Sequence, residues 1–194
     1  MKATAVLLKY KRIEEIKLIV KELEKYPDLI NEIIIWDNSA ENMCGYGRYL
    51  GALKAKNDII YTQDDDCIVK NIRELFSRFD NTIIVNNMTP HHIKKHRRAN
   101  HTLPGWGMIF NKSWIKCLDK YIEIYGVDEL FIRDTGRIFT GLYGEWESIV
   151  GKIKNLPSRK GKMALCKQAK HKSFKKLAVK RINVIRALKQ AGGL

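Results

Sequence analysis

An apolar run that ends in three consecutive aspartates is the feature that most constrains this chain. Residues 59 to 69 have the sequence IIYTQDDDCIV, so Asp64, Asp65 and Asp66 directly follow a strand-like stretch. In α/β sheets, ligands bind at the carboxyl ends of strands. Three adjacent carboxylates repel one another at neutral pH unless a cation compensates them. The run predicts a site for Mg²⁺ or Mn²⁺, which accept carboxylate oxygens and bridge to phosphates; a solvated acidic turn is the alternative.

The pattern around this run predicts an α/β fold. Apolar, β-branched segments predict strands at residues 3–8, 32–36, 58–62, 82–86 and 105–110. Helical spacing predicts helices at residues 13–26, 45–56, 71–79, 113–125, 128–139 and 171–190, the last one basic and amphipathic. Polar or glycine-containing stretches predict loops at residues 89–103, 140–144 and 151–163. Such alternation is typical of a mixed, mainly parallel sheet flanked by helices.

The length and composition set limits on the class of protein. A chain of 194 residues is long enough to bury a sizeable core. We expect a catalytic domain over residues 1–150, with a donor half (1–70) and an acceptor half (71–150), and a basic appendage over 151–194 that completes the site. No apolar run of 18 or more residues occurs, and the early charges of MKATAVLLKYKR favour a first strand over a secretory signal. Four cysteines without CxxC spacing indicate reduced thiols and a cytoplasmic location.

The net charge of +15 is concentrated at the C-terminal end of the chain. Residues 151–194 contain 14 Lys or Arg and no Asp or Glu, whereas residues 1–150 contain 22 basic and 21 acidic residues. This asymmetry predicts a polyanionic partner, which could be nucleic acid, an anionic membrane surface or an acidic polysaccharide. A solvated basic face that aids solubility is the alternative.

Three segments in a fixed order suggest a family. A strand ending in IIIWDNS is followed by GYGRYLGALK and then by YTQDDDC. This order resembles the GT-A glycosyltransferases, nucleotide-sugar enzymes whose donor half ends in a DxD motif. It is most similar to the exostosin-like branch, which has an apolar strand ending in Trp-Asn-Asn and a later Leu-Asp-Asp-Asp. The resemblance covers roughly residues 3–175, and it differs at Gln63, where an apolar residue is usual.

The resemblance implies a donor site built from the ends of three strands. The residues after the first two strands would contact the nucleotide base and ribose, Arg48 would reach the diphosphate or hold the aspartates, and the first two aspartates would meet ribose, sugar or metal. These implied donor residues are Lys9, Tyr10, Arg12, Asp37, Asn38, Arg48, Asp64 and Asp65. Asp66 would bind Mn²⁺ or Mg²⁺ directly, and His171 would return to the metal from the C-terminal segment. A solvated histidine is the alternative for His171.

The resemblance also implies an acceptor site. Asp128 and Glu129 are similar to the acidic pair that opens a helix on the acceptor side, where one would act as general base in an inverting reaction. Helix N-terminal acidity is the alternative reading of that pair. The run Gly105-Trp106-Gly107 is similar to a strand that donor sugar and acceptor approach closely. Arg97 and Arg98 would contact acceptor phosphates or the donor diphosphate from a mobile loop whose interleaved histidines (91, 92, 96 and 101) lack zinc-site spacing.

The predicted function is therefore metal-dependent transfer of a sugar from a nucleoside diphosphate sugar, most simply UDP-linked, to a hydroxyl. The favoured acceptor is a hydroxymethylated base of phage-type DNA in a host cytoplasm, because Lys and Arg release counterions from phosphates. A flipped-out base could stack on Trp106 or Tyr143. One alternative is an enzyme of glycan or glycolipid assembly, with helix 171–190 lying apolar side down on anionic lipid. Another is a non-enzymatic basic nucleic-acid-binding module. No obligate protein partner is predicted.

Overall fold

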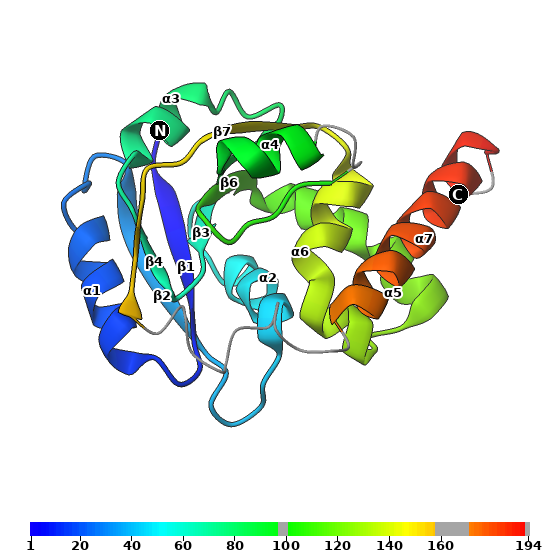
Figure 1. Ribbon diagram of the computed structural model, residues 1–194, viewed down its shortest axis with the longest axis horizontal. Helices are drawn as coiled ribbons and strands as arrows, with labels where there is room; N and C mark the ends of the chain where they lie inside the picture. Colours follow the sequence, from blue (N-terminus) through cyan, green and yellow to red (C-terminus); the bar gives the residue numbers. More distant parts are fainter. Residues whose placement is uncertain (97–100, 158–170, 193–194) are drawn as a thin grey trace.

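A six-stranded sheet organises the molecule (Figure 1). The computed structural model describes residues 1–96, 101–157 and 171–192. The strands are β1 (Ala3–Lys9), β2 (Ile30–Asp37), β3 (Ile59–Gln63), β5 (Ile84–Met88), β6 (Met108–Asn111) and β7 (Trp146–Val150), in the order β2-β1-β3-β6-β5-β7. β1 pairs parallel with β2 and β3, and β5 pairs parallel with β7, whereas β6 is antiparallel to both neighbours. The predicted mixed, mainly parallel sheet is confirmed.

Helices cover both faces of this sheet because alternate strand residues point to opposite sides. On one face, Val6, Ile60 and Phe110 belong to a cluster with residues of α2 (Gly47–Leu53), α6 (Glu129–Tyr143) and α7 (His171–Gln190). On the other face, the neighbouring residues Tyr61 and Ile109 pack with α1 (Ile13–Leu23) and α3 (Ile72–Arg78). The remaining elements are η1 (Cys44–Tyr46), α4 (Pro90–His96), η2 (Lys112–Leu118), α5 (Asp119–Tyr125) and the small sheet of β4 (Cys67–Val69) with β8 (Ile153–Asn155).

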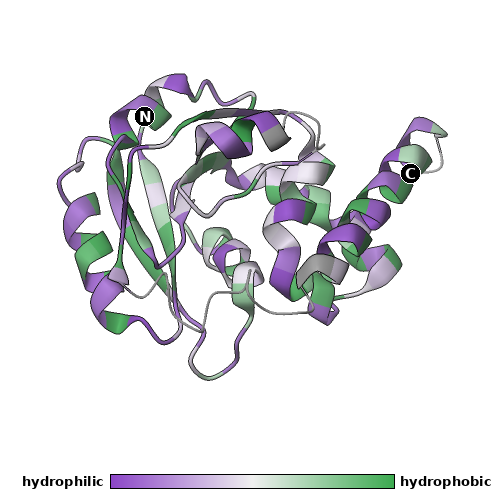
Figure 2. Ribbon diagram, viewed as in Figure 1, coloured by the Kyte–Doolittle hydropathy of each residue, from purple (hydrophilic) through white to green (hydrophobic). Residues whose placement is uncertain are grey.

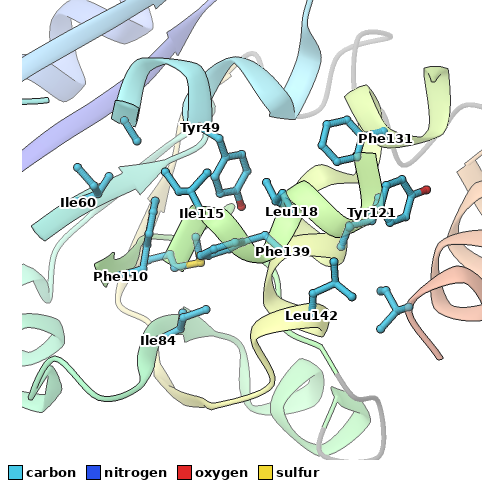
Figure 3. Packing of buried hydrophobic residues seen from close by; sticks show 14 of the residues in the cluster. Tyr49, Ile60, Ile84, Phe110, Ile115, Leu118, Tyr121, Phe131, Phe139 and Leu142 are labelled. Carbon is cyan, nitrogen blue, oxygen red and sulfur yellow. The ribbon is translucent and has the colours of Figure 1, made fainter. Parts of the chain in front are cut away.

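Aromatic packing fixes α2 against the sheet and α6. Figure 3 shows Tyr49 of α2 directed toward Phe110 of β6 and Phe139 of α6. The ring centroids of Tyr49 and Phe139 are 5.0 Å apart, as are those of Phe110 and Phe139. All three side chains are fully buried, and such aromatic contacts add to the free energy of burial. The position of Arg48, one residue before Tyr49, is therefore set by the core.

The basic helix α7 packs against α6 with its apolar face. Ala178, Ile182 and Ile185 are buried there. Gly141 of α6 permits the close approach, because a Cβ at this position would lie 2.7 Å from Ile182 Cδ1. The predicted amphipathic helix is confirmed; Leu177, next to Ala178, lies outside the packed face, since 39% of this residue is exposed. None of the described helices has the length and apolar character that crossing a lipid bilayer requires.

Several predicted boundaries are wrong for identifiable reasons. The predicted loop 89–103 contains α4, where Pro90 occupies the first helical position and the Thr89 hydroxyl accepts a hydrogen bond from His92 N. The predicted strand 105–110 begins only at Met108, because Gly107 has a φ of +98°. The predicted helix 113–125 is divided into η2 and α5, and the helix predicted to end at residue 139 continues through Tyr143. Within the predicted loop 151–163, β8 pairs with β4.

Replacing Ile182 tests how α7 is held. Ile182→Ala should lower the free energy of unfolding by about 2 to 5 kcal/mol, because it leaves a cavity between α7 and α6. Val184→Ala is the matched control on the same helix, and since 41% of Val184 is exposed it should change stability by less than about 0.5 kcal/mol. Urea unfolding measures both. Equal values for the two variants would contradict the packing of α7 on α6.

Candidate active site

The aspartate triplet lies in a turn at the C-terminal end of β3, and hydrogen bonds hold this turn from several sides. Gln63 is buried; its Nε2 donates to the carbonyl of Cys67 at 2.7 Å, and its Oε1 accepts from the Tyr61 hydroxyl at 2.7 Å. The amide of Asp64 donates to the carbonyl of Gly105 at 3.0 Å. A polar residue at position 63, unusual for the family it resembles, thus braces the turn from inside.

The downstream side of the turn is tied to the small sheet. The carbonyl of Asp66 accepts a hydrogen bond from the amide of Leu156 at 2.9 Å, directly after β8. The segment that follows β7 therefore returns to the turn that bears the aspartates.

Two arginines engage the first two aspartates. Arg48 Nη2 donates to Asp64 Oδ1 at 2.8 Å, and Arg12 Nη1 donates to Asp65 Oδ1 at 2.5 Å. Arg48 is only 5% exposed, and its Nε and Nη1 atoms are buried without a hydrogen-bond partner among the described residues. A guanidinium has five N–H donors, and buried donors are rarely left unpaired. Arg48 thus holds Asp64 and keeps two donors that a further anionic or carbonyl group could accept from.

The arginines do not fully compensate the carboxylates. Burial raises the pKa of Asp65 above its ordinary value, and the nearby charge of Asp64 also raises it, although the cation of Arg12 opposes both. The two arginines draw Asp64 and Asp65 into separate ion pairs. Within the described part of the chain, no three His, Cys, Asp or Glu side chains converge on one point. Of the two predicted metal ligands, Asp66 lies in the turn, and His171 begins α7 with its side chain outside the described residues.

The predicted base-binding residues lie at the ends of β1 and β2. Lys9 Nζ is 2.5 Å from Asp37 Oδ2, and this ion pair with the hydrogen bonds from Ser39 lowers the pKa of Asp37 to about 2. Asn38 is 2% exposed: its amide donates to the carbonyl of Lys9 at 2.7 Å and its Nδ2 to the carbonyl of Cys44 at 3.2 Å. Asn38 therefore anchors the chain between β2 and η1. The Lys11 ammonium lies over the ring of Tyr10, 5.0 Å from the ring centroid.

The glycines on the predicted acceptor side allow the chain to approach the aspartates. A Cβ at Gly105 would lie 2.5 Å from Asp64 Oδ2, and the left-handed backbone of Gly107 also favours glycine. Trp106 between them is partly exposed and meets the ring of His92 edge to face, with centroids 5.6 Å apart. The structure thus brings the predicted Gly-Trp-Gly run against the triplet.

The predicted catalytic pair opens α6. Asp128 caps the helix: its Oδ1 accepts from the Phe131 amide at 2.8 Å and its Oδ2 from Arg181 Nη1 at 2.6 Å. Both oxygens of Asp128 therefore have strong donors. Glu129 is paired with Arg133 at 3.0 Å, and about half of its side chain, 51%, is exposed. Their catalytic roles stay predictions. Arg97 and Arg98 lie outside the described residues.

A buried polar group near the site was missed by the sequence analysis. Arg137 is 2% exposed; its Nε donates to Asp134 Oδ2 at 2.7 Å, and its Nη1 donates to Nε2 of His101. The helical geometry of α6 is interrupted at Asp134. His101 was expected in a mobile loop, but it is 3% exposed, so that expectation is wrong for this residue. The only sequence signal was an Asp and an Arg three residues apart on one helix face.

This group ties the chain before Gly105 to α6. Thr102 exchanges two hydrogen bonds with the hydroxyl of Thr140, through its amide at 3.1 Å and its carbonyl at 2.8 Å. Gly136 lies against Pro104, since a Cβ there would be 2.7 Å from Pro104 Cγ. Residues 101–104 are therefore fixed on α6, and α6 in turn positions Gly105 beside Asp64.

Solved structures share this fold. No protein-family model matches the chain, and no curated protein matches it either. The crystal structure of S. aureus TarS 1-349 in complex with UDP-GlcNAc aligns with a TM-score of 0.54 and 14% identity, covering 78% of this chain and 57% of that one. Glucosyl-3-phosphoglycerate synthase from Mycobacterium tuberculosis, in complex with Mn²⁺, UDP and phosphoglyceric acid, aligns with a TM-score of 0.50 and 11% identity, covering 80% and 72%.

These similarities show that the chain has a GT-A fold. The chain spans a little over half of the TarS fragment with which it aligns. The particular likeness to the exostosin-like branch stays a prediction.

Lys9→Met tests the electrostatics at the β2 end of the site. The Lys9 ammonium is the largest cause of the low pKa of Asp37, so its removal should raise that pKa from about 2 toward the ordinary 3.8. Because the folded-state pKa is lowered, the stability contributed by Asp37 is present above pH 3.8 and is lost as the pH falls toward 2. An NMR titration of the carboxyl carbon measures the pKa. Lys11→Met, which removes the cation over Tyr10, is the control; an unchanged pKa in Lys9→Met would contradict the ion pair.

Proposed function

We propose that this protein transfers a sugar from a nucleoside diphosphate sugar, most simply a UDP-sugar, to a hydroxyl acceptor with the help of a divalent cation. One observation carries the proposal: the triplet lies at the C-terminal edge of a GT-A sheet, beside a buried arginine of which two nitrogens, Nε and Nη1, have no hydrogen-bond partner among the described residues. Ligands of open α/β sheets bind at this edge. The nucleotide-sugar substrate would place its diphosphate between Arg48 and the bound cation.

The residues of the turn suit a hard divalent cation. Asp65 and Asp66 offer carboxylate oxygens, the ligand type that Mg²⁺ and Mn²⁺ prefer. Burial raises the pKa of Asp65 and Arg12 opposes this only in part, so a cation beside the carboxylate would favour its charged form. When bound, a divalent cation supplies Lewis-acid stabilisation of the charge that develops on the leaving diphosphate. We propose Asp66 as the first ligand, with Asp65 and His171 as further candidates.

The side chains around the turn would bind and orient the donor. Arg48 can donate from Nε and Nη1 to a phosphate or sugar oxygen while its Nη2 keeps Asp64 in place. Asp64, which Arg48 holds in place, would accept hydrogen bonds from ribose or sugar hydroxyls. Lys9 and Asp37, at the ends of adjacent strands, would flank the base and ribose. Hydrogen-bond donors that are already in position before the reaction stabilise developing negative charge without reorganisation of the protein.

The proton of the acceptor hydroxyl requires a base. Both oxygens of Asp128 are occupied by the helix amide and Arg181, whereas Glu129, which pairs with Arg133 on the surface, projects from the same helix end with about half of its side chain exposed. We therefore propose Glu129 as the general base in an inverting transfer. In a retaining transfer the same carboxylate would bind the acceptor or stabilise the cationic sugar.

The acceptor itself is proposed from charge and surface. The net charge of +15 and the partly exposed Trp106 beside His92 support a hydroxymethylated DNA base. Exposed aliphatic residues on α7 support a glycan or glycolipid acceptor at a membrane. A non-enzymatic nucleic-acid-binding module would leave the aspartate triplet and its arginines without a role.

Asp66→Ala tests the proposed metal ligand. Loss of a carboxylate that holds the cation should lower turnover by at least about 100-fold, because stabilisation of the leaving diphosphate is lost. UDP release from a panel of UDP-sugars in Mn²⁺ measures turnover, and EDTA should abolish it in the wild type. Asp58→Asn is the control, since 80% of that side chain is exposed. Wild-type turnover in a correctly folded Asp66→Ala protein would rule out the assignment.

Gly105→Ala tests the position of Asp64. The added methyl group would lie 2.5 Å from Asp64 Oδ2, so the carboxylate or the strand entry must shift. A displacement of this size at a reacting group can lower kcat/KM by about 100-fold. Gly45→Ala is the matched control, because its methyl group would meet only carbonyl oxygens at 3.5 and 3.8 Å. Equal kcat/KM values for the two folded variants would show that Asp64 does not need its observed position.

A further inference from the structure

Helix α7 has a second apolar stripe besides the one that packs on α6. Leu177, Val184 and Leu188 are 39%, 41% and 39% exposed. Their spacing of seven and four residues places them on one side of the helix, turned away from the buried residues Ala178 and Ile182. Figure 2 shows hydrophobic residues interspersed with hydrophilic ones along the outer side of α7. Packing against α6 therefore accounts for only one of the two apolar stripes.

Helix α5 packs beside α7 through Arg181. Arg181, one turn from both Leu177 and Val184, has its guanidinium over the rings of Tyr121 and Tyr125, 5.8 and 4.6 Å from their centroids. The side of α7 that bears the stripe is thus the side that adjoins α5. Ile124, near the C-terminal end of α5, and Val127, two residues after that helix, are 38% and 45% exposed. The α5–α7 patch is defined as Ile124, Val127, Leu177, Val184 and Leu188.

Positive charge borders this patch. Lys176 and Lys180 are exposed on the adjoining side of α7, and residues 171–190 contain no Asp or Glu. The charge of Arg181 is offset within the protein by Asp128, at 2.6 Å. The exposed Glu123 of α5 is paired with Lys120 at 2.9 Å. The patch therefore combines exposed aliphatic side chains with exposed lysines whose long stems can extend beside them.

We propose that the α5–α7 patch docks on an anionic lipid bilayer, with α7 lying in the headgroup layer. An interfacial helix gains free energy from apolar burial and from attraction to anionic headgroups, so aliphatic residues and lysines both contribute. A nucleic-acid surface would use the lysines but would gain little from exposed Leu and Val, because phosphate contacts dominate there. The stripe that we propose to face lipid therefore differs from the apolar side predicted from the sequence, because that side packs on α6. This inference does not depend on sugar transfer.

Vesicle flotation of the full chain tests the proposal directly. The protein should float with vesicles of phosphatidylcholine and phosphatidylglycerol, and not with phosphatidylcholine alone. Val184→Ser with Leu188→Ser should lower the apparent affinity for these vesicles at least about tenfold, since two aliphatic side chains that would be buried in lipid are lost. Ile13→Ser with Leu18→Ser is the matched control on α1, where these residues are 54% and 49% exposed. Circular dichroism checks that each variant is folded.

A charge pair separates lipid from other partners. Lys176→Glu with Lys180→Glu should lower flotation with anionic vesicles, whereas Lys17→Glu with Lys21→Glu on α1 should leave it unchanged. The proposal is overturned by equal flotation with neutral vesicles, or by flotation that survives the Val184 and Leu188 substitutions. It is also overturned if the α7 lysine variant loses binding to duplex DNA while the wild type fails to float. A dimer in sedimentation that Val184→Ser dissociates, without flotation, would assign the patch to a second copy of this chain.

Discussion

The ion pair between Arg48 and Asp64 is the interaction on which the rest of the site depends. Arg48 is buried next to Tyr49, which packs against Phe110 and Phe139, and its guanidinium reaches Asp64 at the end of β3. The backbone amide of Asp64 in turn donates a hydrogen bond to the carbonyl of Gly105, and a side chain at residue 105 would collide with the Asp64 carboxylate. A charge taken out of water needs a partner at close range, and breaking such a pair costs more than the pair contributes. The core of the GT-A sheet therefore sets the position of the first carboxylate.

The same arrangement leaves electrostatic capacity unused, and this is the physical link to the proposed chemistry. Two donors of Arg48 are unpaired among the described residues, and burial keeps the pKa of Asp65 raised despite Arg12. A diphosphate and a divalent cation carry the two kinds of charge that this site lacks. Gln63 and the Asp66 carbonyl hold the turn at its two ends, so these charges meet a backbone that is already braced.

Local sequence patterns predicted much of the fold and less of the site. The apolar run before the triplet, the IIIWDNS strand and the helical spacing of 171–190 are local signals, and the structure has β3, β2 and α7 there. The His101–Arg137–Asp134 group depends on residues 36 positions apart and has no local signature. The strand β8 is three residues long and exists because it pairs with β4, which periodicity cannot reveal. The outer stripe of α7 could not be separated from the inner one by sequence alone, because only the packing on α6 shows which apolar residues stay exposed.

A crystal of the protein soaked with Mn²⁺ and UDP tests the central claim most directly. The account predicts an anomalous manganese peak in contact with the Asp66 carboxylate, a diphosphate between that ion and Arg48, and new acceptors on Arg48 Nε or Nη1. A manganese peak remote from residues 64–66, or UDP bound elsewhere with the Arg48–Asp64 and Arg12–Asp65 pairs unchanged, would contradict it.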